Sequence, residues 1–220
     1  MRRRGANRYR RRGPGAPQAR PTPPARRGAP GATARPPQEP LSAAGFLAEL
    51  SAGGARPELV ELRAGLAVPV PRPGPGGAVA LAALHARLRE AATRPGGAAP
   101  LAAPLVRVGP YDLWRPALGL VAGARRAFGG ALPAHASVEA TALLLAVEAL
   151  PDRGAVVRRL AGYAAAAVDE VWVIDVRSGW TEAYRSPWAG AYRSRTLWYP
   201  GEALPLRALP GVAVVALEAA

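Results

Sequence analysis

The sequence predicts an α/β domain in which helices flank a mixed β-sheet, with a disordered arm in front of it. The run 140–150 is apolar without polar alternation, and 170–176 is rich in β-branched residues, as in buried strands. In two other segments, 78–94 and 153–167, apolar residues recur at helical spacing. The composition also changes near Pro40. Helices interleaved with buried strands indicate an α/β fold around one core.

The first segment of the chain differs from the rest in charge. Residues 1–40 contain 11 basic residues and one acidic residue, a formal charge of +10, whereas the remainder has 18 basic and 14 acidic residues, or +4. A segment so rich in Arg, Pro and Gly cannot bury enough apolar surface to offset the entropy of ordering it. We therefore expect residues 1–41 to form a disordered basic arm and residues 42–220 to form one domain.

The first half of the domain contains three local patterns. Ser42 is placed to cap a short helix that ends at Gly53. ELVELRAGLAVPVP alternates apolar and polar residues around Ala64-Gly65, which is typical of a β-hairpin. AVALAALHARLREAATR has leucines near helical spacing and stops before Pro95, which predicts a helix.

The second half of the domain is mostly strands around one helix. The run ATALLLAVEAL predicts a central strand. Pro151-Asp152 is placed to start a helix, on which the apolar stripe is formed by Val156, Leu160, Tyr163 and Ala167. EVWVIDV follows as a second buried strand. Shorter strands are expected at PLVRV, YDLW and ALGLVAG, and later at WTEAY, YRSRTLWY, LPLRAL and VAVVAL.

Composition excludes several classes of site and protein. There is no cysteine, which excludes disulfides and thiolate metal sites. All 29 basic residues are Arg, which excludes any mechanism that needs a lysine ammonium. The arginines of the arm precede prolines and glycines where a signal sequence needs an apolar core, and no stretch predicts a membrane span. A cytoplasmic protein without membrane contact is the simplest inference.

The basic arm has two interpretations. Arg-rich segments release counterions from phosphate and bind nucleic acid without sequence preference, and the pI of about 11.5 favours such a partner. Alternatively, MRRRGANRYRRRGP is a solvated tail, or is translated from a start codon placed too far upstream in a GC-rich gene.

A family resemblance runs in order through residues 42–220. AVEALPDRGAVVRRLAGYAAAAVDEVWVIDV resembles the central signature of the Uma-two family, predicted bacterial restriction endonucleases of the PD-(D/E)XK nuclease superfamily. The residues in register with that signature are Tyr163, Ala164, Glu170, Trp172, Val173 and Asp175. ELVELRAGLAV and LPGVAVVALEA resemble the family's hairpin and closing strand, and His85 stands where its first long helix usually has a His. The resemblance implies a restriction-endonuclease-like mixed sheet flanked by helices.

The resemblance also implies a chemistry. The family hydrolyses DNA with a divalent cation such as Mg²⁺, held by at least two carboxylates, and with a Lys that orients the attacking water. Glu148 matches the family's strand Glu. The metal-binding Asp, however, aligns with Ala117, a second Asp with Ala142, and the Lys with Arg159. A methyl group cannot bind a metal, and Arg, with a pKa above about 12, cannot act as a base.

Three other carboxylates are candidates to replace the missing ligands. In continuous strands Asp112 would lie about 16 Å from Ala117 on the opposite face, and Glu139 would face away from Glu148. Asp152 lies just beyond the strand and is the best substitute, although a role in capping the helix explains its position better. The candidate metal ligands are therefore Glu148 and Asp152. The candidate catalytic residues are Glu148, Asp152 and Arg159.

The matched residues also have structural interpretations. A site or an ion pair with Arg159 would each account for a buried Glu148. His85 resembles a half-exposed helix residue more than a ligand, and an adjacent pair such as Arg158-Arg159 is usually solvated. The spacing of three aromatic residues is typical of side chains that pack in the core or on the sheet: Tyr163, Trp172 and Trp198.

Three functions remain open from the sequence. We favour a divergent Uma-two-type protein whose DNA cleavage is weak or lost and whose basic surface binds nucleic acid, above all DNA. The second is an active Mg²⁺-dependent endonuclease with a rearranged site of Glu148, Asp152 and Arg159. The third is a non-enzymatic scaffold or binding module on the same fold. A homodimer is compatible with each.

Overall fold

The chain divides into two units, Met1–Gln38 and Glu39–Ala220. The computed structural model describes residues 39–53, 60–93, 97–124, 127, 136–149, 153–215 and 217. The basic arm expected over residues 1–41 lies outside the described residues, except for its last three positions. All elements below belong to the second unit.

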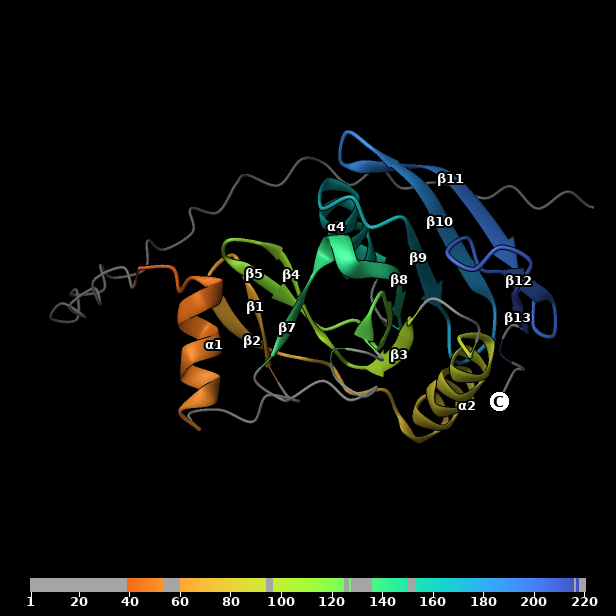
Figure 1. The fold of residues 1–220 in the computed structure, drawn as a ribbon, viewed down its shortest axis with the longest axis horizontal. Helices are drawn as coiled ribbons and strands as arrows, with labels where there is room; N and C mark the ends of the chain where they lie inside the picture. Colours follow the sequence, from red (N-terminus) through yellow and green to blue (C-terminus); the bar gives the residue numbers. More distant parts are fainter. Residues whose placement is uncertain are drawn as a thin grey trace, which may run out of the picture. The chain divides into compact units, whose positions relative to one another are not determined.

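A five-stranded sheet and a short helix form the first part of this unit (Figure 1). Its strand order is β2-β1-β5-β4-β7. The strands are β1 (Val60–Arg63), β2 (Leu66–Pro69), β4 (Leu105–Gly109), β5 (Asp112–Trp114) and β7 (Ser137–Glu139). Helix α1 (Ala43–Ser51) packs on this sheet through Phe46, which lies in one core cluster with Leu62 and Leu113. Because Leu62 faces α1, its neighbour Glu61 points to the opposite face.

Two local predictions in this part are confirmed. The Ser42 hydroxyl accepts a hydrogen bond from Gly45 N at 3.1 Å and so caps α1. The predicted hairpin is β1-β2, and its turn residues Ala64 and Gly65 have φ of 47° and 77°. Glycine adopts such a left-handed conformation without steric cost, which is why the turn falls here.

A six-stranded sheet forms the second part. Its order is β11-β10-β9-β8-β6-β3. The strands are β3 (Ala99–Ala102), β6 (Leu118–Val121), β8 (Leu143–Glu148), β9 (Glu170–Ile174), β10 (Thr181–Trp188) and β11 (Ala191–Trp198). The pair β8-β9 is parallel and the other neighbours are antiparallel. Both strands predicted to be buried are thus central, and a small hairpin of β12 (Ala203–Pro205) and β13 (Ala213–Val215) follows.

Two helices cover opposite faces of the six-stranded sheet. Leu88 of α2 (Pro75–Ala91) shares a core cluster with Val147 of β8. Tyr163 of α4 (Arg153–Ala165) shares a second cluster with Ala146. Since successive strand residues face opposite ways, Glu148 at the end of β8 faces α4. No helix in the described parts of the chain is long and apolar enough to cross a membrane.

Several element boundaries differ from the prediction. The apolar run 140–150 opens with a 3₁₀ turn at Ala140–Ala142, and only then becomes β8. The helix α4 ends at Ala165, so Ala167 lies beyond it with a φ of 59°. Strands β3 and β7 were not predicted. Each has only three or four residues, and β3 pairs with β6 while β7 pairs with β4. Because such short strands form through pairing with a neighbour, their own sequences do not predict them.

Candidate active site

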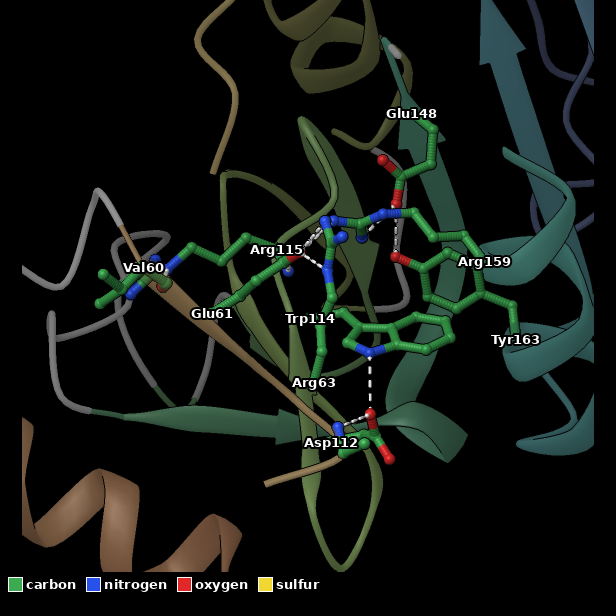
Figure 2. Close-up of polar contacts among 10 residues, drawn as sticks. Val60, Glu61, Arg63, Asp112, Trp114, Arg115, Glu148, Arg159 and Tyr163 are labelled. Carbon is green, nitrogen blue, oxygen red and sulfur yellow. Dashed lines mark hydrogen bonds and ion pairs between the residues drawn. The ribbon is translucent and has the colours of Figure 1, made fainter. Parts of the chain in front are cut away.

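Glu148, the family's strand Glu by resemblance, is buried at the end of β8 and bound by two side chains of α4 (Figure 2). Its Oε1 accepts hydrogen bonds from Arg159 Nη1 at 2.9 Å and from the Tyr163 hydroxyl at 2.6 Å. The ion pair that would account for a buried Glu148 is therefore present. Burial raises the pKa of Glu148 to about 7, against the opposing effects of Arg159 and Tyr163.

Arg159 has a second carboxylate partner, Glu61 of β1. Its Nη2 donates to both Glu61 oxygens, at 2.7 Å and 2.6 Å. Arg63 Nε and the backbone N of Arg115 donate to the same carboxylate. Arg159 is 4% exposed and Glu61 is fully buried. One buried guanidinium thus joins strands of both sheets to α4.

We call Glu61, Arg63, Glu148, Arg159 and Tyr163 the ion cluster. Its two carboxylates face two guanidinium groups, the buried Arg159 and the partly exposed Arg63, and their attraction offsets the desolvation cost of burying the charges. Burial lowers the pKa of Arg159, but Glu148 and Glu61 raise it above its ordinary value, so the side chain stays charged. Burial raises the pKa of Tyr163 well above its ordinary value, so its hydroxyl stays protonated and donates.

The ring of Trp114 lies against the cluster. It meets Tyr163 edge to face with 5.1 Å between ring centroids, and the Arg159 guanidinium carbon lies 5.6 Å from the Trp114 ring centroid. Gly162 makes this approach possible, because a Cβ there would lie 2.0 Å from Trp114 Cη2. The ring covers the guanidinium on that side, as Figure 2 shows.

The structure does not bring the other predicted carboxylates into the cluster. Asp152 lies outside the described residues. Asp112 accepts hydrogen bonds from Ala64 N at 2.9 Å and from Trp114 Nε1 at 3.3 Å, and so stabilises the β1-β2 turn. Asp112 and Ala117 do not share a continuous strand, because β5 ends at Trp114 and β6 begins in the other sheet.

Two further residues also have partners elsewhere. Glu139 forms an ion pair with Arg107, and the Glu139 side chain is 64% exposed. It is not in one strand with Glu148, because the 3₁₀ turn separates β7 from β8. His85 Nε2 lies 3.2 Å from the Pro100 carbonyl oxygen, and the side chain is half-buried, as expected for a helix residue. The adjacent pair Arg158-Arg159 is split, with Arg158 exposed and Arg159 buried in the ion cluster.

The sequence did not single out the two β1 residues of the cluster, of which Glu61 is the buried one. Glu61 lies 98 positions before Arg159, in the hairpin that resembles the family's. An acidic residue between Val60 and Leu62 is the normal alternation of a half-exposed strand, so the local pattern gives no sign of burial. Tyr163 was interpreted as core packing, and it also donates to Glu148.

The cluster does not fit a divalent cation. Both carboxylates are engaged by Arg159, and within the described ranges no three His, Asp or Glu side chains come together to hold a metal ion. Leu118 pairs with Val147, so the same register continued by one residue puts Ala117 across from Glu148. The position that the resemblance gives to the metal-binding Asp therefore has only a methyl group.

A pocket lies next to the ion cluster, and the chain neighbours Ala149 and Leu160 line it. This pocket, of about 450 Å³, opens beside the ends of β8 and β9, and its lining also includes Asp175 and Trp180. None of the cluster residues lines it. Together with the burial of Glu61, this makes the ion cluster part of the interior.

The fold is similar to that of a solved structure. A crystal structure described as a putative nuclease belonging to DUF820, from Anabaena variabilis, matches with a TM-score of 0.57 and 13% sequence identity, over 71% of this chain and 86% of that one. No protein-family model and no curated protein matches the sequence. DUF820 corresponds to the Uma-two family, so the predicted resemblance is confirmed at the level of fold. The chain has the α/β fold of this DUF820 structure.

Proposed function

We propose that this is a nuclease-fold protein that binds nucleic acid and whose DNA cleavage is weak or lost. The observation that carries the proposal is the position of the Arg159 guanidinium, which hydrogen-bonds to both Glu61 and Glu148. A hard divalent cation would need those carboxylate oxygens as its own ligands. The guanidinium supplies a permanent positive charge there, and it has no site at which a water can be activated.

The remaining groups of the cluster do not replace metal chemistry. A carboxyl group with a pKa near 7 is suited to proton transfer, and the pKa of Glu148 is raised to about 7 by burial. Its Oε1 is nevertheless held by two donors, and the residue is 2% exposed. A phosphodiester would reach it only after the cluster had opened. The cluster therefore favours a structural role for Glu148 and Arg159.

Nucleic acid is the partner that charge and fold favour together. The chain has a formal charge of +14, and 11 of its arginines lie in residues 1–40. Arginine side chains bind phosphate through charge-assisted, often bidentate hydrogen bonds. The solved structure of similar fold is described as a putative nuclease, and nucleases act on nucleic acid.

Calorimetry and a cleavage assay test the loss of activity. Titration of the full chain with Mg²⁺ or Mn²⁺ is expected to give no binding heat, and a plasmid-nicking assay no metal-dependent nicking. The variants are Glu148→Ala and, as a matched control, the exposed Glu139→Ala. Metal-dependent nicking that is lost in Glu148→Ala and kept in Glu139→Ala would show an active endonuclease instead.

Salt-dependent DNA binding tests the other half of the proposal. The affinity of the full chain for DNA is expected to fall steeply between about 50 mM and 200 mM salt, because bound arginines release counterions. A chain that neither nicks nor binds DNA would be a scaffold protein instead.

A further inference from the structure

The β10-β11 hairpin combines aromatic and basic residues with a single acidic residue, Glu182, at its base. From Ala183 to Gly201 the sequence has three Arg and no Asp or Glu. The same 19 residues include five of the chain's 13 Trp, Tyr and Phe residues. Core packing does not explain the aromatic side chains of this segment that face solvent, Trp188 and Tyr199.

Trp188 is the aromatic side chain at the tip of this hairpin. It is 63% exposed, although a Trp ring is among the largest apolar groups that a protein can bury. Next to it, Ala189 and Gly190 have φ of 49° and 76°, the conformation of a tight two-residue hairpin turn. By contrast, Tyr192 points inward, where its hydroxyl donates to the Val168 carbonyl oxygen at 2.6 Å. The turn therefore holds the Trp188 ring in solvent, while the Tyr192 ring is half-buried against the core.

Two arginines without carboxylate partners contact the tip region of the hairpin, Arg193 at Trp188 and Arg207 at Ser186. The Arg193 guanidinium carbon is 4.4 Å from the centroid of the Trp188 ring. Arg207 Nη1 donates to Ser186 Oγ at 2.9 Å, two residues before Trp188. Among the described residues neither guanidinium pairs with a carboxylate, whereas the hairpin's other two arginines pair with buried glutamates. The surface around Trp188 therefore has a net positive charge.

A flat exposed ring beside unpaired guanidinium groups fits an unstacked nucleobase and its phosphates. Aromatic side chains stack on single-stranded bases of any sequence, and neighbouring arginines neutralise the backbone. In a double helix the base faces are already stacked on each other and do not meet such a ring. An acidic peptide would use the arginines and would leave the ring face unused.

We propose that the tip of the β10-β11 hairpin binds single-stranded nucleic acid. Trp188 stacks on one base, and Arg193 and Arg207 contact neighbouring phosphates. This inference rests on the proposed nucleic-acid binding and adds the surface and the strandedness of the partner.

Fluorescence anisotropy with a labelled 20-nucleotide oligo(dT) and the full chain tests the stacking. Trp188→Ala is expected to weaken binding by about 5- to 100-fold, because one base loses its stacking partner. Trp188→Phe keeps a ring and is expected to stay within a few-fold of the wild type. The matched control is Tyr111→Ala, which removes another exposed ring, 43% accessible, from a turn of the other sheet and is expected to change nothing.

The salt dependence of the same binding tests the phosphate contacts. Arg193→Ala is expected to reduce the slope of log affinity against log salt by about 0.7, one phosphate contact on a single strand. Arg89→Ala removes an exposed arginine at the end of α2 and is expected to leave the slope unchanged.

Three results would overturn the inference. If the wild type binds oligo(dT) and Trp188→Ala binds equally well, the hairpin is not the contact, and the proposed function stands. If the wild type prefers a duplex of the same length, the single-stranded partner is wrong. If the wild type binds neither, the proposed function fails as well.

Discussion

At the scale of single residues, the arrangement depends on Arg159. Its guanidinium is buried between Glu61 and Glu148 and hydrogen-bonds to both. A buried ion pair adds little stability over an apolar replacement, but removal of one member leaves an uncompensated charge in the interior. Arg159 is therefore expected to contribute strongly to the stability of the fold whether or not it has a chemical role.

Replacement of Arg159 by Ala leaves two buried carboxylates without their shared cation. We expect a loss of about 3–5 kcal/mol in the free energy of unfolding, measured by urea denaturation. The control is Arg107→Ala, which removes a partner from the exposed pair with Glu139 and is expected to cost about 1 kcal/mol or less. Equal losses in the two variants would contradict a buried ion cluster.

Glu148 makes stability depend on pH in a defined direction. Burial raises its pKa to about 7 from an ordinary 4.5. An acid whose pKa is raised on folding stabilises the folded state fully below its unfolded pKa, and this stabilisation is lost as the pH rises through its folded pKa. From pH 4 to pH 8, wild type is expected to lose up to about 3 kcal/mol relative to Glu148→Gln. Urea denaturation of both proteins across this range checks it, and a constant difference would contradict the raised pKa.

The residues of the cluster were only partly predictable from the sequence. Glu148 and Arg159 lie 11 positions apart on a consecutive strand and helix, so their pairing follows from local order. Glu61 reaches the same guanidinium from 98 positions away, through the pairing of β1 within another sheet. That contact depends on the topology, which no local pattern of charges reveals.

At the scale of elements, α4 and β5 approach so closely that one position tolerates only glycine. Ala is a better helix former than Gly by about 1 kcal/mol, but a Cβ at Gly162 would lie 2.0 Å from the ring of Trp114. We expect Gly162→Ala to lower the thermal unfolding temperature, since overpacking costs about 1–3 kcal/mol. Ala161→Gly, at an exposed position of the same helix, measures the difference in helix propensity between Ala and Gly without a change in packing. A raised unfolding temperature in Gly162→Ala would show that the ring is free to move.

The long elements were predicted well because their patterns are periodic. The helix α2 has buried leucines at positions 81, 84 and 88, and it starts slightly earlier than expected, at Pro75. The strands β8 and β9 follow from their apolar runs. Short strands such as β3, with Pro100 in the middle, exist through their partner strand. The division of the strands between two larger sheets likewise follows from pairing and not from any one segment.

At the scale of the whole molecule, the buried core and the exposed hairpin have separate roles in our proposals. The ion cluster joins strands of the two sheets and α4 in the interior. The surface proposed for binding lies at the tip of the β10-β11 hairpin. Strands β11 and β3 form the two opposite edges of the six-stranded sheet. In these proposals the hairpin binds nucleic acid while the interior holds no cation. Loss of binding is therefore expected to be separable by mutation from loss of cleavage.

The proposed replacement of a cation by Arg159 is best tested by anomalous diffraction from crystals of the full chain soaked in MnCl₂, recorded at the manganese edge. We predict no anomalous peak between the Glu61 and Glu148 carboxylates, and an Arg159 guanidinium hydrogen-bonded to both. A peak within coordination distance of a Glu148 oxygen, with the Arg159 side chain displaced, would contradict the replacement and restore the case for a metal-dependent nuclease.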